Sequence, residues 1–184
     1  MKVGIIYGWS EGKWHGKLLR KELHLQGFTL TSDLTEADAL IAHSGGSYLL
    51  PDNGRAGVVM LIGIPWHSTE HPLKGLMKKV KYEIKDVWWY KKTFYNTLYF
   101  LSRPLRWLKM YKAWKAKRLP KTTESIVIAV RNNDDHFMHP IESGVLASER
   151  GWKLKNLEGH HDDLWINPKP YVRLLKEATT GLKD

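Results

Sequence analysis

The sequence predicts an α/β fold: a three-layer sandwich in which helices cover a mostly parallel sheet of about six strands. Short β-rich apolar runs alternate along the chain with longer segments of helical periodicity, which is the pattern of successive βα units. The chain has 184 residues, enough for one core of ordinary size and too few for two comfortable ones. We therefore expect a single domain that spans residues 1–184.

The predicted elements follow the apolar pattern in order. Strands are expected at 3–7, 28–31, 39–42, 57–62, 125–130 and 152–157, and helices at 13–25, 140–149 and 168–182. Only residues 32–38 join the second and third strands, so the usual crossover helix is expected to be missing there. The apolar run that opens the chain is too short for a signal peptide, no apolar run reaches membrane-spanning length, and cysteine is absent. These features predict a soluble, cytoplasmic protein.

A basic, aromatic insertion separates the fourth and fifth predicted strands. Residues 74–118 hold 14 of the 29 lysines and arginines but only two acids, Glu83 and Asp86, so the rest of the chain is nearly neutral. Apolar residues recur every three or four positions from Leu73 to Trp88, and Pro104 suits the first turn of a further helix. We expect residues 70–120 to form a helical cap. Peripheral contact with an anionic membrane surface is a second interpretation of its composition, and nucleic-acid binding is disfavoured because no recognised motif accompanies it.

A candidate nucleophile follows the third predicted strand in the sequence Ala42-His43-Ser44-Gly45-Gly46. A nucleophile elbow needs a strained turn that lifts the serine Oγ above the sheet, so the neighbours of the serine must be small. Ala42, Gly45 and Gly46 meet that demand, although a plain glycine turn would give the same pattern. The amide of Gly45 is a candidate oxyanion donor.

Carboxylates and imidazoles follow the last two strands, where parallel strands deliver side chains to one edge of the sheet. The fifth strand leads into Arg131-Asn132-Asn133-Asp134-Asp135, and the sixth into Glu158-Gly159-His160-His161-Asp162-Asp163. A serine hydroxyl needs a histidine as general base, and the histidine needs an acid that fixes its tautomer. The alternative is a metal site, because imidazoles and carboxylates are also good zinc or iron ligands. Its candidate ligands are His136, His139, His160 and His161 with Asp134, Asp135, Asp162 and Asp163.

With these motifs in place, the chain resembles the α/β-hydrolase superfamily, specifically its small members akin to the retinoblastoma-binding-protein hydrolases. The resemblance implies the strand order 2-1-3-4-5-6. It implies Asp134 as the triad acid, with Asp135 in reserve, because Arg131-Asn132-Asn133-Asp134 matches a Gly-x-x-Asp loop except at its first residue. It implies His161 rather than His160 as the base, from its spacing to Pro168.

The same resemblance assigns an oxyanion loop and an activity. Tyr7-Gly8-Trp9-Ser10 is similar to the His-Gly-x-x loop, with the amide of Trp9 or Ser10 as second donor and Tyr7 in place of the histidine. The predicted function is an esterase or acyl hydrolase that forms an acyl-enzyme on Ser44 and needs no cofactor. The alternative is a catalytically weak protein of this fold that binds anionic lipid or nucleic acid through its basic insertion.

Overall fold

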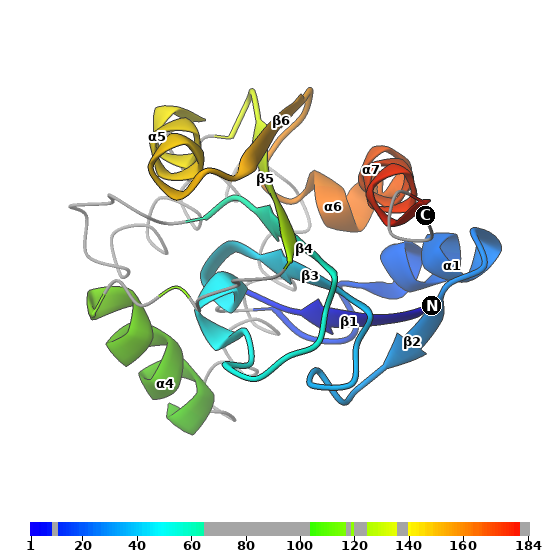
Figure 1. Cartoon of the computed structure of the whole chain (residues 1–184), viewed down its shortest axis with the longest axis horizontal. Helices are drawn as coiled ribbons and strands as arrows, with labels where there is room; N and C mark the ends of the chain where they lie inside the picture. The colour runs from blue at the N-terminus through cyan, green and yellow to red at the C-terminus, as the bar shows by residue number, and fades with distance from the viewer. Residues whose placement is uncertain (9–10, 65–103, 117–118, 120–124, 136–139, 181–184) are drawn as a thin grey trace, which may run out of the picture.

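The computed structural model describes residues 1–8, 11–64, 104–116, 119, 125–135 and 140–180. Its strands are β1 (Lys2–Ile6), β2 (Thr29–Thr31), β3 (Ala39–His43), β4 (Val58–Ile62), β5 (Ile126–Asn132) and β6 (Lys153–Leu157). They form one parallel sheet in the order β2-β1-β3-β4-β5-β6 (Figure 1). The predicted fold class and strand order are confirmed, and β3 extends one residue further than predicted, to His43.

Helices cover both faces of this sheet. The described helices are α1 (Lys17–Leu25), the 3₁₀ helix η1 (Ser44–Leu49), α4 (Pro104–Lys115), α5 (Pro140–Arg150), α6 (Asp163–Ile166) and α7 (Lys169–Thr180). Figure 1 shows α1, α6 and α7 gathered together and α5 apart from them. The buried side chains follow this division, since those of α1, α6 and α7 belong to one apolar cluster and those of η1 and α5 to a second.

Alternation along the central strands produces the two clusters. In β3, Ala39 and Ile41 join the cluster under α1 and α7, whereas Leu40 and Ala42 join the cluster under η1 and α5. Every residue of β3 and β4 is buried, as expected for central strands of a parallel sheet that is covered on both faces. Because the strands are parallel, their carboxyl ends lie at one edge of the sheet, and the candidate residues follow the ends of β3, β5 and β6.

The connection from β2 to β3 contains no helix, as the sequence predicts. A local bond and a bond to β1 hold it instead: the amide of Thr35 donates to Asp33 Oδ1 at 3.0 Å, and the amide of Asp38 donates to the carbonyl of Lys2 at 2.9 Å. Such a side-chain turn satisfies backbone groups that a crossover helix would otherwise satisfy.

Only the last part of the basic insertion lies among the described residues. The predicted helix face from Leu73 to Trp88 is outside them, whereas α4 begins at Pro104, as its pattern predicts. Met110 of α4 is fully buried, and α4 packs against η1. The guanidinium of Arg106 donates to the carbonyls of Tyr7 (2.6 Å) and Glu11 (3.2 Å), so α4 is fixed to the segment that follows β1. Among the described helices, none is long and apolar enough to cross a membrane.

Candidate active site

Ser44 occupies a strained turn between β3 and η1. Its φ is +50°, and it is the only residue other than glycine with positive φ in the described part of the chain. The preceding residue, His43, is still extended, with φ −108° and ψ 135°. Left-handed backbone costs an ordinary residue free energy and persists only where the surrounding structure imposes it. A serine held this way directly after a buried central strand has the backbone geometry of a nucleophile elbow.

Close packing around the turn explains why small residues follow the serine. A Cβ built on Gly46 would lie 2.6 Å from the carbonyl oxygen of Ile6 and 2.7 Å from that of Tyr7. Only glycine permits this approach of η1 to the end of β1. The hydroxyl of Ser47 donates to the carbonyl of Ser44 at 2.9 Å, which closes the first turn of η1. Gly45 is buried beside Ser44, and Trp9 and Ser10, the other predicted oxyanion donors, lie outside the described residues.

A buried imidazole and a buried carboxylate meet between the ends of β5 and β6. His161 Nδ1 lies 2.7 Å from Asp135 Oδ2, and both side chains are almost wholly buried. His160 is exposed, and its Nδ1 faces the carbonyl of Asp134 at 3.1 Å. The structure therefore turns His161 inward, as predicted, but gives it Asp135 as its carboxylate partner. The preference for Asp134 needs correction, because the side chain of Asp134 is exposed.

A tight turn explains the choice between the two aspartates. The amide of Asp135 donates to the carbonyl of Asn132, so the chain reverses directly after β5. The amides of Asn133 and Asp134 donate to the carbonyls of Leu157 and Gly159, which ties this turn to the end of β6. Asp135, which comes after the turn, is therefore the residue whose side chain points inward. A Gly-x-x-Asp pattern places the acid one residue too early, at Asp134, because it does not count the extra residue of the turn.

Two donors hold the backbone on either side of the inward histidine. Asn132 Nδ2 donates to the carbonyl of His160 at 2.7 Å, and Asn132 Oδ1 accepts the hydroxyl of Tyr171 at 2.8 Å. Burial raises the pKa of Tyr171, so this phenol stays protonated and remains a donor. The carbonyl of His161 is held by His43 Nε2 at 2.8 Å. The imidazole of His161 is therefore carried by a backbone that is fixed at both peptide groups.

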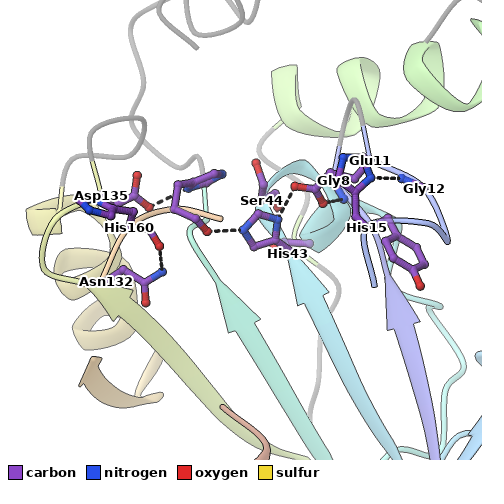
Figure 2. A network of polar contacts seen from close by, with 12 residues as sticks. Gly8, Glu11, Gly12, His15, His43, Ser44, Asn132, Asp135 and His160 are labelled. Atoms are coloured by element: carbon purple, nitrogen blue, oxygen red, sulfur yellow. Dashed lines mark hydrogen bonds and ion pairs between the residues drawn. The ribbon is translucent and has the colours of Figure 1, made fainter. Parts of the chain in front are cut away.

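The sequence analysis missed His43 and Glu11. His43 is fully buried, and its Nδ1 lies 2.7 Å from Oε1 of the equally buried Glu11. The other oxygen of Glu11, Oε2, accepts the amide of Gly8 at 2.5 Å. Figure 2 shows this network running from Gly8 through Glu11 to His43, beside Ser44. A signal existed: a histidine at the end of a strand that is otherwise apolar is a buried polar group that requires a partner.

Among the candidate ligands of the alternative metal site that the structure describes, the two adjacent histidines do not point to one place. His136 and His139 lie outside the described residues, and His160 and His161 face different directions. Within the described part, His43, His161 and Asp162 do place potential ligand atoms within 4.8 Å of one another. However, both nitrogens of His43 and Nδ1 of His161 already face other partners. Since both ring nitrogens of His43 are engaged, this imidazole does not offer the open nitrogen that a zinc ligand needs, and we assign no metal to the group.

Comparison with known proteins places this geometry in a wider context. No family model matches the sequence, and no curated protein matches it. Among solved structures, an α/β-hydrolase enzyme from a sediment metagenome of the Mar Chica lagoon superposes with a TM-score of 0.65 at 13% identity, over 100% of this chain and 92% of that one. A carboxylesterase of the thaumarchaeon Nitrososphaera gargenis gives 0.62 at 12% identity, over 99% and 90%.

A third structure extends the comparison to thioesters. A thioesterase of the prodiginine biosynthetic pathway in Streptomyces coelicolor gives a TM-score of 0.65 at 12% identity, over 97% of this chain and 89% of that one. These likenesses do not single out the retinoblastoma-binding-protein hydrolases, so that finer resemblance stays a prediction. Together with the strand order and the turn at Ser44, they show that this chain has the α/β-hydrolase fold.

Proposed function

We propose that this protein is a serine hydrolase in which Ser44 is the nucleophile, His161 the general base and Asp135 the acid that orients the base. One observation carries the proposal: a buried Asp135–His161 pair lies at the same edge of the sheet as a serine with strained backbone. A carboxylate on Nδ1 fixes the tautomer in which Nε2 carries no proton and can accept one from a hydroxyl. Such a pair is therefore suited to activate a serine.

The proposed reaction is acyl transfer to water through a covalent intermediate. Ser44 Oγ attacks the carbonyl carbon of the substrate while its proton passes to His161, which then donates that proton to the leaving group. Water, deprotonated by the same imidazole, then releases the acid and regenerates Ser44. The amide of Gly45 is the proposed first donor to the oxyanion, and Trp9 or Ser10 remains the predicted source of the second. No step requires a cofactor.

Esters and thioesters are the proposed substrate class. The structural neighbours named above include a carboxylesterase and a thioesterase, and both bonds present an acyl carbon to the same nucleophile. An imidazole that takes up a proton in the transition state can pass it to the alcohol leaving group of an ester or to the thiol leaving group of a thioester. A panel of p-nitrophenyl esters and acyl thioesters would separate the two.

Covalent labelling tests the proposal directly. A fluorophosphonate probe should label the wild-type protein and should not label Ser44→Ala. Ser148→Ala, which removes an exposed hydroxyl on α5, is the matched control and should label as the wild type does. Absence of labelling in the wild type, or equal labelling of Ser44→Ala, contradicts the assignment of Ser44.

One feature of α4 favours a second candidate function, binding to an anionic surface. Leu105 is 81% exposed and Leu108 39% exposed, and the neighbouring Lys109, Lys112 and Lys115 are exposed as well. Apolar side chains bordered by lysines on one helix are typical of contact with anionic lipid headgroups. We propose this contact as an accompaniment to hydrolysis, and as the main role if Ser44 does not react.

A further inference from the structure

A second carboxylate–imidazole pair, formed by Glu11 and His43, lies beside the proposed nucleophile (Figure 2). His43 precedes Ser44 in the chain, and its ring lies between Glu11 Oε1, at 2.7 Å from Nδ1, and the carbonyl oxygen of His161, at 2.8 Å from Nε2. The rings of His43 and His161 have centroids 4.6 Å apart. His43 Nε2 thus contacts the backbone carbonyl of the proposed base, and this contact involves neither ring nitrogen of His161.

The partners of His43 determine where its protons lie. A carbonyl oxygen can only accept a hydrogen bond, so Nε2 must carry a proton to bond the carbonyl of His161. Nδ1 faces a carboxylate, which also accepts unless it is protonated. One further proton must therefore be shared between Nδ1 and Glu11. With that proton on the imidazole, His43 is a cation that donates its Nε2 proton to the carbonyl of His161 and forms an ion pair with the carboxylate of Glu11 through Nδ1.

The charged groups around His43 favour this protonated form. Burial by itself would lower the pKa of His43, but the charge and hydrogen bond of Glu11, the charge of Asp162 and the carbonyl of His161 together raise it. The remaining neighbours on the packed elements are the imidazole of His161 and the edge-on indole of Trp165. Glu11 is the main cause of the upward shift.

Glu11 extends the connection to the segment that follows β1. Its Oε2 accepts the amide of Gly8 at 2.5 Å, next to the predicted oxyanion residues Trp9 and Ser10. Its own backbone carbonyl accepts Arg106 from α4. A continuous series of contacts therefore runs from Gly8 through Glu11 and His43 to the backbone of His161, beside Ser44.

We propose that Glu11 and His43 are positioning residues for the hydrolytic reaction, which set the backbone of the His161 base and of the loop after β1 relative to Ser44. This inference rests on the proposed function. Neither residue contacts the reacting atoms in this assignment, because both act through backbone groups. A buried ion pair is weak evidence of a stabilising role, because proteins in which apolar residues replace such a pair are often equally stable. Misplacement of reacting groups by about 1 Å can cost about 100-fold in rate.

A spectroscopic experiment tests the proton arrangement without any activity. Imidazole ¹⁵N shifts report which ring nitrogens carry protons, and we expect both nitrogens of wild-type His43 to be protonated at neutral pH. In Glu11→Gln, Nδ1 should lose its proton while Nε2 keeps one, because the carbonyl of His161 still requires a donor. A wild-type His43 that lacks the Nε2 proton overturns the proposal.

Kinetics test the positioning role with a variant that leaves no buried charge unpaired. Glu11→Gln/His43→Leu removes the donor to His161, and we expect kcat for a p-nitrophenyl ester to fall about 100-fold with little change in KM. Glu11→Gln/His43→Gln, which restores a side-chain amide donor, should recover part of that loss. His24→Leu, a substitution of an exposed histidine on α1, is the control and should turn over as the wild type does. A folded Leu variant with wild-type kcat overturns the proposal.

The low-field resonance of the His161 Nδ1 proton separates this proposal from the proposed function. If the Leu variant shifts or broadens that resonance and His24→Leu does not, the contact with His43 positions the imidazole of His161. If wild-type Ser44 does not react with the fluorophosphonate, the proposed hydrolase function is rejected, and the positioning role in catalysis is rejected with it. If Ser44 is labelled but neither the resonance nor kcat responds to the Leu variant, only the positioning role is rejected.

Discussion

Gly63 and His161 are packed so closely that no side chain fits between them. A Cβ built on Gly63 would lie 2.8 Å from His161 Cε1 and 2.9 Å from Nδ1, and it would also come within 3.3 Å of Asp135 Oδ2. Gly63 directly follows β4 and has φ +59°, a conformation that glycine adopts without steric cost. The end of β4 thus forms one wall of the place where imidazole and carboxylate meet.

Gly63→Ala should therefore lower ester turnover strongly while it lowers the free energy of unfolding only modestly. The methyl group would push the imidazole of His161 away from Asp135, and misplacement of about 1 Å can cost about 100-fold in turnover. The left-handed backbone adds a cost of about 1–2 kcal/mol to folding. Ester turnover and urea unfolding, measured on the same preparation, check the two effects.

Gly151→Ala is the matched control for that substitution. Gly151 has a similar φ of +66°, but nothing lies within 4 Å of a Cβ built on it. It should lose a similar amount of stability and keep its turnover. Equal losses of turnover in the two variants would show that backbone strain, rather than contact with His161, causes the effect.

Asp135→Asn should abolish most of the activity while Asp134→Asn should not. A carboxylate that holds the base in one tautomer and stabilises the imidazolium supports about four orders of magnitude of turnover in triads generally. Asp135 contacts His161, whereas the side chain of Asp134 is exposed. Steady-state kcat for a p-nitrophenyl ester checks the pair. The reverse result would return the acid to Asp134.

The sheet was predictable because its signals are local. Apolar runs of strand length mark each strand, and the resemblance to a known superfamily supplies their order. The ends of elements are less predictable: helix α1 begins at Lys17 rather than at residue 13, and a short helix, α6, precedes α7. Both differences lie next to turns, where backbone and side-chain hydrogen bonds rather than periodicity decide the conformation.

The site was predictable only in part, because two of its features depend on contacts between distant segments. The choice between Asp134 and Asp135 follows from amides that bond to the end of β6, about two dozen residues further along the sequence. The Glu11–His43 pair joins segments from either side of β2. No spacing rule encodes such a pair, although a buried histidine in an apolar strand indicates that a partner exists.

The stability of the protein should decrease at alkaline pH through His43. Burial opposes the charge on this imidazole, but Glu11, Asp162 and the carbonyl of His161 outweigh burial and raise the pKa above its ordinary 6.5. A group with a raised pKa in the folded state stabilises fully below its unfolded pKa, and this contribution is lost as pH rises through the folded pKa. The free energy of unfolding in urea should therefore fall as the pH rises above the ordinary imidazole pKa of 6.5.

Glu11→Gln should flatten that pH dependence, because it removes the main cause of the raised pKa. Glu149→Gln, on the exposed surface of α5, should leave the pH dependence as it is in the wild type. Parallel curves for Glu11→Gln and the wild type would mean that His43 does not titrate in the range, and would contradict the assignment of a raised pKa to Glu11.

Contact of α4 with anionic membranes is the remaining prediction. Leu105, Leu108 and Lys112 are spaced by three and four residues, so they share one helix face, and all three are exposed. Burying leucine in the headgroup region and pairing lysine with anionic lipid act together. We expect the protein to co-sediment with vesicles that contain phosphatidylserine more than with neutral vesicles, and less at high salt because exposed charges are screened.

Substitutions on this face should weaken that binding by predictable amounts. Lys112→Gln should lower the vesicle partition coefficient about fivefold, since each lysine near an anionic surface contributes about 1 kcal/mol. Leu105→Glu should lower it further, because it removes an apolar contact and adds a repelled charge. The controls are Lys21→Gln and Leu25→Glu, which change exposed residues of α1 and should bind as the wild type does. If the α1 variants lose as much vesicle binding as the α4 variants, the binding depends on the net charge of the protein and not on α4. Equal partition into anionic and neutral vesicles would contradict an electrostatic contribution from α4.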